Sequence, residues 1–234
     1  MFIHGRRLLL EEEPLIVMAR ELTETADRFR SDLLLWAETN LREFPWRDDE
    51  RTLYEVFIAE FFLTQTPANN VARVYPDFLN EFPTLHSIRK SNVDDLERTI
   101  RPLGFQRMRA EALSRIASEY DDLPKVPEEM EELTRVGPYV ANATLCIACE
   151  RSLPILDRNV KRVYRRVFGN QFPQGEGNQM EFTKRMLPDD GSTAQRYNLA
   201  LVDFGALVCE KLEPICEVCF APEYCSYYEE EVDV

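Results

Sequence analysis

The sequence has 234 residues, enough for one large domain or two small ones with a buried core. Its formal net charge is −14, so the chain lacks the overall basic character on which phosphate binding usually rests. No apolar run approaches the roughly 20 residues that span a bilayer, and the chain starts without a secretory cleavage pattern, so we expect a cytoplasmic protein without a membrane anchor.

Apolar residues recur at intervals of three and four along much of the chain, for example in 113–120 and 197–208, whereas the alternation typical of strands is sparse. Prolines and glycines interrupt this pattern often enough to predict about ten helices of ordinary length. We therefore expect an all-α fold, and we assign no structure to the termini at 1–19 and 229–234.

The first segment with chemistry of its own is YEVFIAEFFLTQT, residues 54–66. Helical spacing places Glu60 on the same face as Val56 and Phe57, so a carboxyl group lies on an apolar stripe. Burial there would raise the pKa of the Glu60 carboxyl and would let it act as a general acid or base near neutral pH. The competing interpretation is a glutamate at the edge of the stripe that reaches water.

Further along, LTRVGPYVANATL at 133–145 predicts a helix end, a glycine turn and a second helix opened by Pro138. Backbone N–H groups at Val136, Gly137 and Tyr139 could bind a DNA phosphate there without any basic side chain, which partly answers the objection from net charge. An ordinary corner between two helices is the competing interpretation.

The segment LPILDRNVKRV at 153–163 begins a further helix at Asp157. An aspartate in this position is usually a helix N-cap. A fixed carboxylate can also stabilise the positive charge that builds on a sugar when its glycosidic bond breaks. The basic residues that follow, including Lys161 and Arg162, fit either a solvated helix face or a contact with DNA.

Four of the six cysteines form a C-x6-C-x2-C-x5-C array near the carboxyl end: Cys209, Cys216, Cys219 and Cys225. Such an array predicts metal binding, and its thiolates could hold either tetrahedral zinc or an iron–sulfur cluster. Cys146 and Cys149 lie on the predicted helix after the glycine turn, and we interpret them as small core residues.

Together these segments resemble the helix-hairpin-helix superfamily of DNA glycosylases, in the branch of endonuclease III, the adenine glycosylases and the archaeal G·T mismatch thymine glycosylase. The cysteine array, which follows the helix YNLALVDFGALVC, is similar to the four-iron, four-sulfur loop of that branch and so implies a [4Fe-4S] cluster. Residues 133–145 are similar to the second half of the hairpin, usually L-P-G-V-G, with Thr134 and Arg135 in place of the proline and the first glycine.

The resemblance also implies roles for single residues. Asp157 matches the essential catalytic aspartate, Asn159 matches an asparagine near the reacting sugar, and Glu60 matches the glutamate that protonates the base in the adenine glycosylases. Tyr139 stands where relatives that also cut the strand carry a lysine, and it completes the implied catalytic set. The implied DNA contacts are the wedge side chains Gln65 and Leu103, the hairpin residues Val136, Gly137 and Tyr139, and the basic residues Lys161 and Arg162.

The implied fold has two helical domains that flank a DNA cleft. A six-helix barrel with the hairpin spans 53–152, and 20–52 together with 153–228 form the iron–sulfur cluster domain. We expect a monomer that acts on double-stranded DNA carrying a mismatched or damaged base.

The implied reaction is hydrolysis of an N-glycosidic bond without strand cleavage, because the phenol of Tyr139 cannot form a Schiff base. The compact length, the wedge helix and a cysteine cluster that ends in CSYY favour removal of thymine or uracil opposite guanine. Glu60, Asn159 and the LDRNVKRV string instead favour adenine opposite G or 8-oxoguanine. Two alternatives keep the DNA contact and lose the chemistry: a non-catalytic mismatch or damage-binding protein, and a zinc-stapled DNA-binding module.

Overall fold

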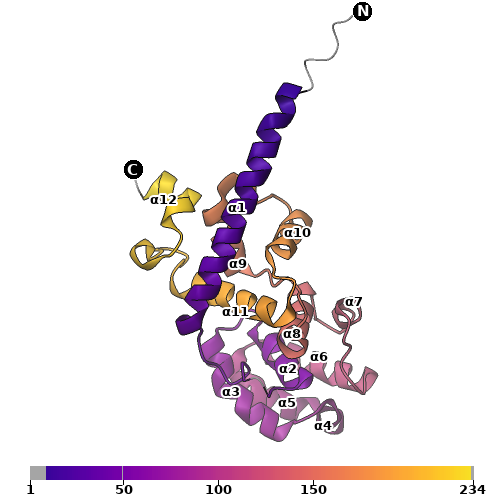
Figure 1. The fold of residues 1–234 in the computed structure, drawn as a ribbon. Coiled ribbons are helices and arrows are strands. Elements are labelled where there is room, and N and C mark those ends of the chain that lie inside the picture. Colours follow the sequence, from indigo (N-terminus) through magenta and orange to yellow (C-terminus); the bar gives the residue numbers. More distant parts are fainter. Residues whose placement is uncertain (1–8, 49, 233–234) are drawn as a thin grey trace, which may run out of the picture. The chain divides into compact units, whose positions relative to one another are not determined.

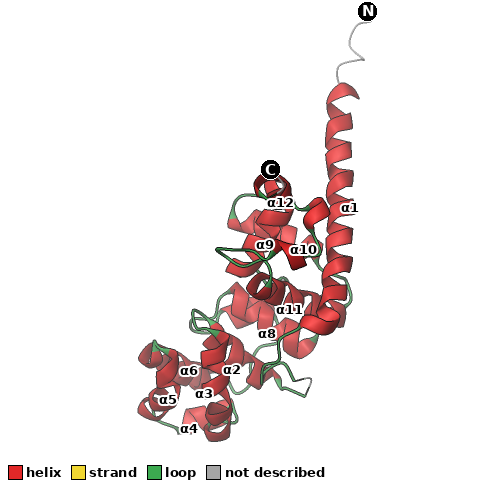
Figure 2. Cartoon of the chain, turned by 90° about the vertical axis from the view of Figure 1, so that its left-hand side faces the viewer, coloured by secondary structure: helices red, strands yellow, loops and turns green. Residues whose placement is uncertain are grey.

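The computed structural model describes residues 9–48 and 50–232. Of the two termini to which the sequence assigns no structure, 9–19 and 229–232 lie within these ranges, and 1–8 and 233–234 lie outside the described residues. Within these ranges every regular element is a helix and no strand is present (Figures 1 and 2), which confirms the all-α prediction. None of the described helices is both long and apolar enough to span a bilayer.

The α-helices are α1 (Leu9–Asn40), α2 (Leu53–Leu63), α3 (Ala68–Glu81), α4 (Leu85–Lys90), α5 (Val93–Ile100), α6 (Gln106–Glu119), α7 (Pro127–Glu131), α8 (Pro138–Cys149), α9 (Arg158–Phe168), α10 (Glu176–Met186), α11 (Gly191–Leu207) and α12 (Ser226–Glu231). Short 3-10 helices are η1 (Arg101–Leu103), η2 (Gly169–Gln171), η3 (Cys216–Val218) and η4 (Pro222–Tyr224).

The described residues divide into two compact units. The first, here called the α2–α8 unit, consists of residues 42–155 and 188–195, and the second, here called the cysteine unit, consists of residues 9–41, 156–187 and 196–232. The sequence predicts that 42–52 belong to the cluster domain, whereas residues 42–48 and 50–52 lie in the α2–α8 unit. They do so because the rings of Phe44 and Trp46 stack at 4.7 Å and pack in its core.

The core of the α2–α8 unit forms around α2, because LYEVFIAEFFL is apolar on nearly every side of the helix. Thr52 begins this helix with a capping box, in which its hydroxyl accepts from the Glu55 N–H while the Glu55 carboxylate accepts from the Thr52 N–H at 2.8 Å. Phe62 of α2 packs edge-on against Phe78 of α3, with ring centroids 4.9 Å apart. Burial fixes the positions of the α2 side chains from Val56 to Phe62, including Glu60.

An aromatic cluster forms the core of the cysteine unit. Phe29 of α1 packs edge-on against Phe168 of α9 at 5.7 Å, and Phe182 of α10 contacts the same Phe168 ring at 5.3 Å. Helix α9 is strongly amphipathic, since RNVKRVYRRVF turns its valines and Tyr164 toward this core and its basic residues away from it. The buried face of α9 thereby fixes the position of Asp157, the residue just before the helix.

Candidate functional site

Asp157 is the N-cap residue of α9. Its Oδ1 accepts a hydrogen bond from the Val160 N–H at 2.7 Å, and its Oδ2 accepts one from Asn159 Nδ2 at 3.2 Å. Burial raises the pKa of the half-buried Asp157 carboxyl, while the hydrogen bonds from Val160 and Asn159 and the charge of Arg162 oppose that rise. Asp157 therefore caps a helix and also carries a carboxyl group whose ionised form is disfavoured by burial.

Asn159 connects Asp157 to the neighbouring helix α11. Its Oδ1 accepts from Arg162 Nη2 at 2.9 Å, the same Nη2 donates to the Gly205 carbonyl at 2.6 Å, and Arg162 Nε donates to the Cys209 carbonyl at 2.9 Å. Gly205 packs so tightly that an added Cβ would lie 2.9 Å from the Asn159 Cβ. Hydrogen bonds thus link Asp157 to Asn159, Asn159 to Arg162, and Arg162 to the backbone of Gly205 and Cys209. This network orients the Asp157 carboxylate.

The basic residues of α9 are only partly available to a ligand. Lys161 Nζ lies 3.2 Å from the Glu176 carboxylate, and the guanidinium of Arg162 is occupied by the network described above. Arg158 and Arg165 on the same helix are exposed. A basic surface is therefore present on α9, and its exposed charges are those of Arg158 and Arg165.

Glu60 lies in the middle of α2 and is 4% exposed. The carboxyl group is therefore buried on the apolar stripe, and the interpretation as a solvated edge glutamate is wrong. Glu60 belongs to the α2–α8 unit and Asp157 belongs to the cysteine unit.

The turn before α8 keeps the backbone shape that a glycine usually provides. Arg135, which replaces the first glycine of the L-P-G-V-G pattern, adopts a left-handed backbone with φ 65°. Val136 is 7% exposed and its N–H donates to the Leu133 carbonyl at 3.0 Å. Gly137 is the N-cap residue of α8. Gly137 and Tyr139 therefore stand at the start of a helix, the part of a helix that is suited to an anion.

Two surface loops of the α2–α8 unit carry the predicted wedge residues. Gln65 follows α2, is exposed and has φ 58°. Leu103 is not at an exposed tip as expected, because its side chain packs in the core and is only 6% exposed. The exposed apolar residue of that loop is Phe105, which is 58% exposed with φ 51°. No signal in the sequence distinguishes Phe105 from Leu103, because both are apolar residues of the same short loop.

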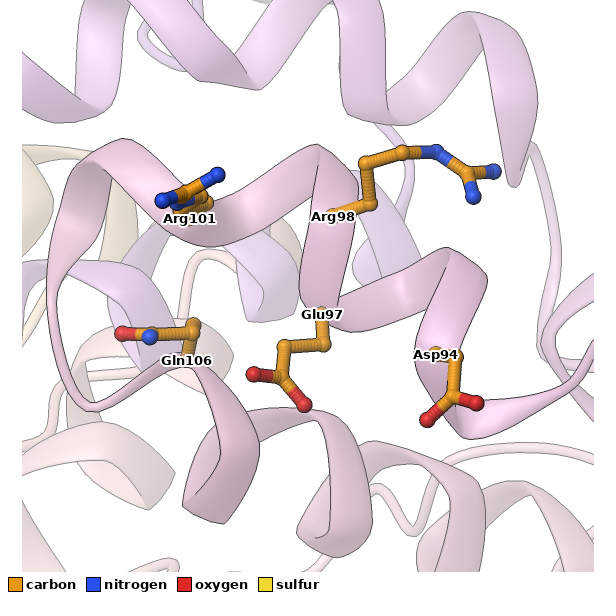
Figure 3. A pocket seen from close by; sticks show the side chains of 5 residues that line it. All are labelled: Asp94, Glu97, Arg98, Arg101 and Gln106. Atoms are coloured by element: carbon orange, nitrogen blue, oxygen red, sulfur yellow. The ribbon is translucent and has the colours of Figure 1, made fainter.

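A surface hollow adjoins this loop on α5 and α6 (Figure 3). Its lining side chains are Asp94, Glu97, Arg98, Arg101 and Gln106. Both carboxylates also accept from Arg107, Asp94 at 2.9 Å and Glu97 at 3.4 Å. Because both acidic and basic groups line the hollow, it presents neither an apolar enclosure for a base nor a uniformly basic surface for phosphate.

The four cysteines of the array all line one small cavity, of about 20 Å³, in the cysteine unit. Burial and, to a lesser extent, the other three cysteines raise the pKa of the Cys219 thiol to about 11. The Ala221 N–H donates to the Cys219 sulfur at 3.4 Å. No group of three or more His, Cys, Asp or Glu side chains in the described part of the chain is placed to hold a metal ion.

Arg166 is the charged residue that lines this cavity. Its guanidinium donates to the Cys209 sulfur at 3.4 Å and to the Lys211 carbonyl at 3.1 Å, and it lies 4.8 Å above the ring of Tyr227. The cysteine loop itself adds little positive charge, since Glu210, Glu213 and Glu217 surround its single lysine. Arg166 thus brings a cation to sulfur and holds the loop against α9.

The comparisons with known proteins agree with one another. A family model described as HhH-GPD superfamily base excision DNA repair protein matches residues 58–187, more than half of the chain. Thymine/uracil-DNA glycosylase of Methanothermobacter thermautotrophicus is 31% identical over 209 residues, which cover 86% of this chain and 93% of that protein. Adenine DNA glycosylase of Mycolicibacterium smegmatis is 32% identical over 194 residues, covering 80% and 66% respectively.

Among solved structures, that of a thermostable thymine-DNA glycosylase has a TM-score of 0.83 and 29% sequence identity. The match covers 89% of this chain and 98% of that one.

Proposed function

Because the chain belongs to the HhH-GPD superfamily of base excision DNA repair proteins, and its relatives are DNA glycosylases, we propose that it is a DNA N-glycosylase that removes thymine or uracil paired with guanine. The observation that carries the proposal is the Asp157 carboxylate, held in place by Val160 and Asn159 in a partly desolvated position. The thymine and thymine/uracil enzymes among the relatives support the choice of base.

In the proposed reaction, Asp157 supplies negative charge to the sugar as the bond to the base breaks. Cleavage of an N-glycosidic bond develops an oxocarbenium-like cation, and a fixed carboxylate stabilises such a transition state more than it stabilises the neutral substrate. Only the ionised form of Asp157 can do this, so excision requires a pH above its raised pKa. Asn159 serves as the positioning residue of the carboxylate.

Water, rather than a protein amine, attacks the sugar in this proposal. The side chain at position 139 is a phenol, which forms no Schiff base with C1′. Treating the reaction with borohydride should therefore trap no protein on DNA, and strand breaks should appear only after alkali. A borohydride-dependent adduct of the wild-type protein would contradict the monofunctional assignment.

The proposed DNA contacts come from the α2–α8 unit. The start of α8, at Gly137 and Tyr139, binds a phosphate through backbone amides. Gln65 and Phe105 enter the space that an extruded nucleotide leaves, with Phe105 in the role that the sequence analysis gave to Leu103. Leu103 itself supports this loop from the core.

We further infer that the cysteine array holds a [4Fe-4S] cluster, which ties the carboxyl-terminal loop to α9 and takes no part in hydrolysis. The four cysteines line one cavity. Four thiolates so placed could bind zinc or an iron–sulfur cluster, and the similarity of their spacing in the sequence to a four-iron, four-sulfur loop favours the cluster. Absorption near 400 nm and bound iron in the purified protein would support the inference, and stoichiometric zinc would contradict it.

Adenine excision is the second candidate function. The buried carboxyl of Glu60 favours it, because a desolvated glutamate is suited to protonate a departing purine. The similarity to adenine DNA glycosylases at 28–32% identity favours it as well.

The test is a panel of duplexes, each with one mispair, incubated with the protein and then cleaved with alkali. The proposal predicts cleavage at T or U opposite G, and the second candidate predicts cleavage at A opposite G or 8-oxoguanine. Tight binding to a mispair without excision of any base would support a damage-binding protein and contradict both.

A further inference from the structure

Two exposed tips of the α2–α8 unit have a backbone conformation that their residues disfavour. Gln65 and Phe105 adopt φ 58° and φ 51°, in the left-handed region that normally favours glycine. Strained residues of this kind persist only where the surrounding structure holds them, and they concentrate at functional sites. A contact that holds both tips must reach the backbone next to Gln65 and next to Phe105.

Arg109 of α6 is that contact on the side of Gln65. Its guanidinium is buried, at 3% exposure, and donates to the carbonyls of Phe62 and Thr64 and to the Thr66 hydroxyl, each at 2.7 Å. These acceptors come from the end of α2 and from both neighbours of Gln65. A cation at the carboxyl end of a helix also interacts favourably with the helix dipole.

Thr66 extends the same contact to the second tip. Its hydroxyl, which accepts from Arg109, donates to the Leu103 carbonyl at 3.4 Å, two residues before Phe105. Arg109 also lies on the first turn of the helix that Phe105 opens, where the Arg109 N–H donates to the Phe105 carbonyl at 3.0 Å. One buried guanidinium therefore connects the backbone on both sides of Gln65 with the turn that carries Phe105.

We propose that Arg109 is the positioning residue that sets Gln65 and Phe105 as a pair and thereby controls extrusion of the target nucleotide. The inference rests on the proposed function. Arg109 touches neither base nor sugar, and its effect on excision passes through the two tips. A planar guanidinium is required because three acceptors in different directions must be satisfied at once, which an ammonium group achieves less well.

The first measurement compares single-turnover excision from two duplexes. In one, the target thymine faces guanine, and in the other it faces an abasic analogue, so that no partner base has to be unpaired. We expect Arg109→Met to slow excision at least tenfold on the first duplex and less than threefold on the second, and Arg109→Lys to give an intermediate loss on the first. The control is Arg107→Met, on the same helix, whose exposed guanidinium binds the surface carboxylates of Asp94, Glu97 and Glu111. Equal losses on both duplexes would overturn the inference.

The second measurement is binding, which does not depend on excision. The wild-type protein and Arg107→Met should prefer a duplex with a tetrahydrofuran abasic analogue to a matched duplex, and Arg109→Met should lose at least tenfold of that preference. Thr66→Val, which removes the shared hydroxyl at nearly constant volume, should lose part of it and replaces Arg109→Met if that variant does not fold. A wild-type protein that binds preferentially but excises nothing would refute the proposed function alone. Unchanged preference in Arg109→Met and Thr66→Val, or no preference in the wild type, would refute the role of Arg109.

Discussion

Asp157 and Asp190 both stand immediately before a helix, yet their carboxylates lie in opposite environments. Asp190 is exposed and accepts from the Thr193 backbone N–H at 2.8 Å and from its hydroxyl at 2.6 Å, and the bonds from Thr193 and Ser192 lower the pKa of its carboxyl. Asp157 makes the corresponding bond to the Val160 N–H, but burial raises the pKa of its carboxyl. The same capping pattern in the sequence thus occurs in two environments. The environment of Asp190 favours the ionised carboxylate, and that of Asp157 disfavours it.

The opposite directions of the two carboxyl pKa values distinguish a structural helix cap from a functional one. A residue kept only to begin a helix gains most from an environment like that of Asp190, where solvent and hydrogen bonds stabilise the charge. The environment of Asp157 costs free energy in the ionised form, and such perturbed groups concentrate at functional sites. We therefore expect substitutions around Asp157 to change excision and the matching substitutions around Asp190 to change stability.

Among the substitutions that compare the two caps, the largest difference in excision rate is expected at the residue two positions after each aspartate. Asn159 donates to Asp157 and Ser192 donates to Asp190. A hydrogen bond to a charged group contributes about 1.5–3 kcal/mol, so Asn159→Ala should slow excision roughly 10- to 100-fold. Losing this bond also raises the pKa of Asp157, so the acidic limb of the pH–rate profile should move to higher pH. Single-turnover rates from pH 5 to pH 9 measure both effects.

Ser192→Ala is the matched control and should leave the rate and its pH profile unchanged. An Asn159→Ala enzyme with wild-type rate and profile would show that Asp157 needs no positioning by this side chain.

A smaller effect is expected at Gly205, where α11 packs against α9. An alanine Cβ would lie 2.9 Å from the Asn159 Cβ and 3.3 Å from Val163, so Gly205→Ala should displace Asn159 and slow excision by about tenfold, or about 1.4 kcal/mol. Gly177→Ala is the control, because its Cβ would meet no atom within 4 Å. Similar excision rates for the two variants would mean that close packing at Gly205 does not position Asp157.

The smallest expected effect is on thermal stability, and it has opposite signs at the two caps. The folded state disfavours ionised Asp157, so stability falls as pH rises through its raised pKa, and Asp157→Asn should keep or raise Tm at pH 7.5 because asparagine also caps helices. The folded state favours ionised Asp190, whose contribution is present above its unfolded pKa and lost as pH falls. Asp190→Asn should therefore lower Tm at pH 7.5, and both differences should shrink toward pH 3. A fall in Tm for Asp157→Asn equal to that for Asp190→Asn would remove the distinction.

Features set by periodicity could be predicted from the sequence. The helical fold, the cap at Asp157 and the buried position of Glu60 follow from the spacing of apolar residues and from local capping preferences. The four cysteines line one cavity, but the metal site that their spacing predicts stays a prediction. The spacing by itself carries no information on which metal would bind, because zinc and iron–sulfur sites use the same ligands.

The surface loops could not be predicted at the same level. From the sequence, either Leu103 or Phe105 could be the apolar residue of this loop that faces solvent. In the structure Phe105 is the exposed one, and it has a left-handed backbone although it is not a glycine. The same conformation at Arg135 preserves the turn before α8 where the sequence pattern lacks its glycine. In both places tertiary contacts override local preference, as the contacts of Arg109 do for Gln65.

The most direct test of the account is the amount of free base released by Asp157→Asn under single-turnover conditions, with DNA affinity measured on the same duplex. The substitution keeps the size and capping ability of the side chain and removes its charge. We predict a loss of excision of at least about a thousandfold, equivalent to about 4 kcal/mol of transition-state stabilisation, with affinity for DNA unchanged. Excision within tenfold of the wild-type rate would show that Asp157 serves the helix alone.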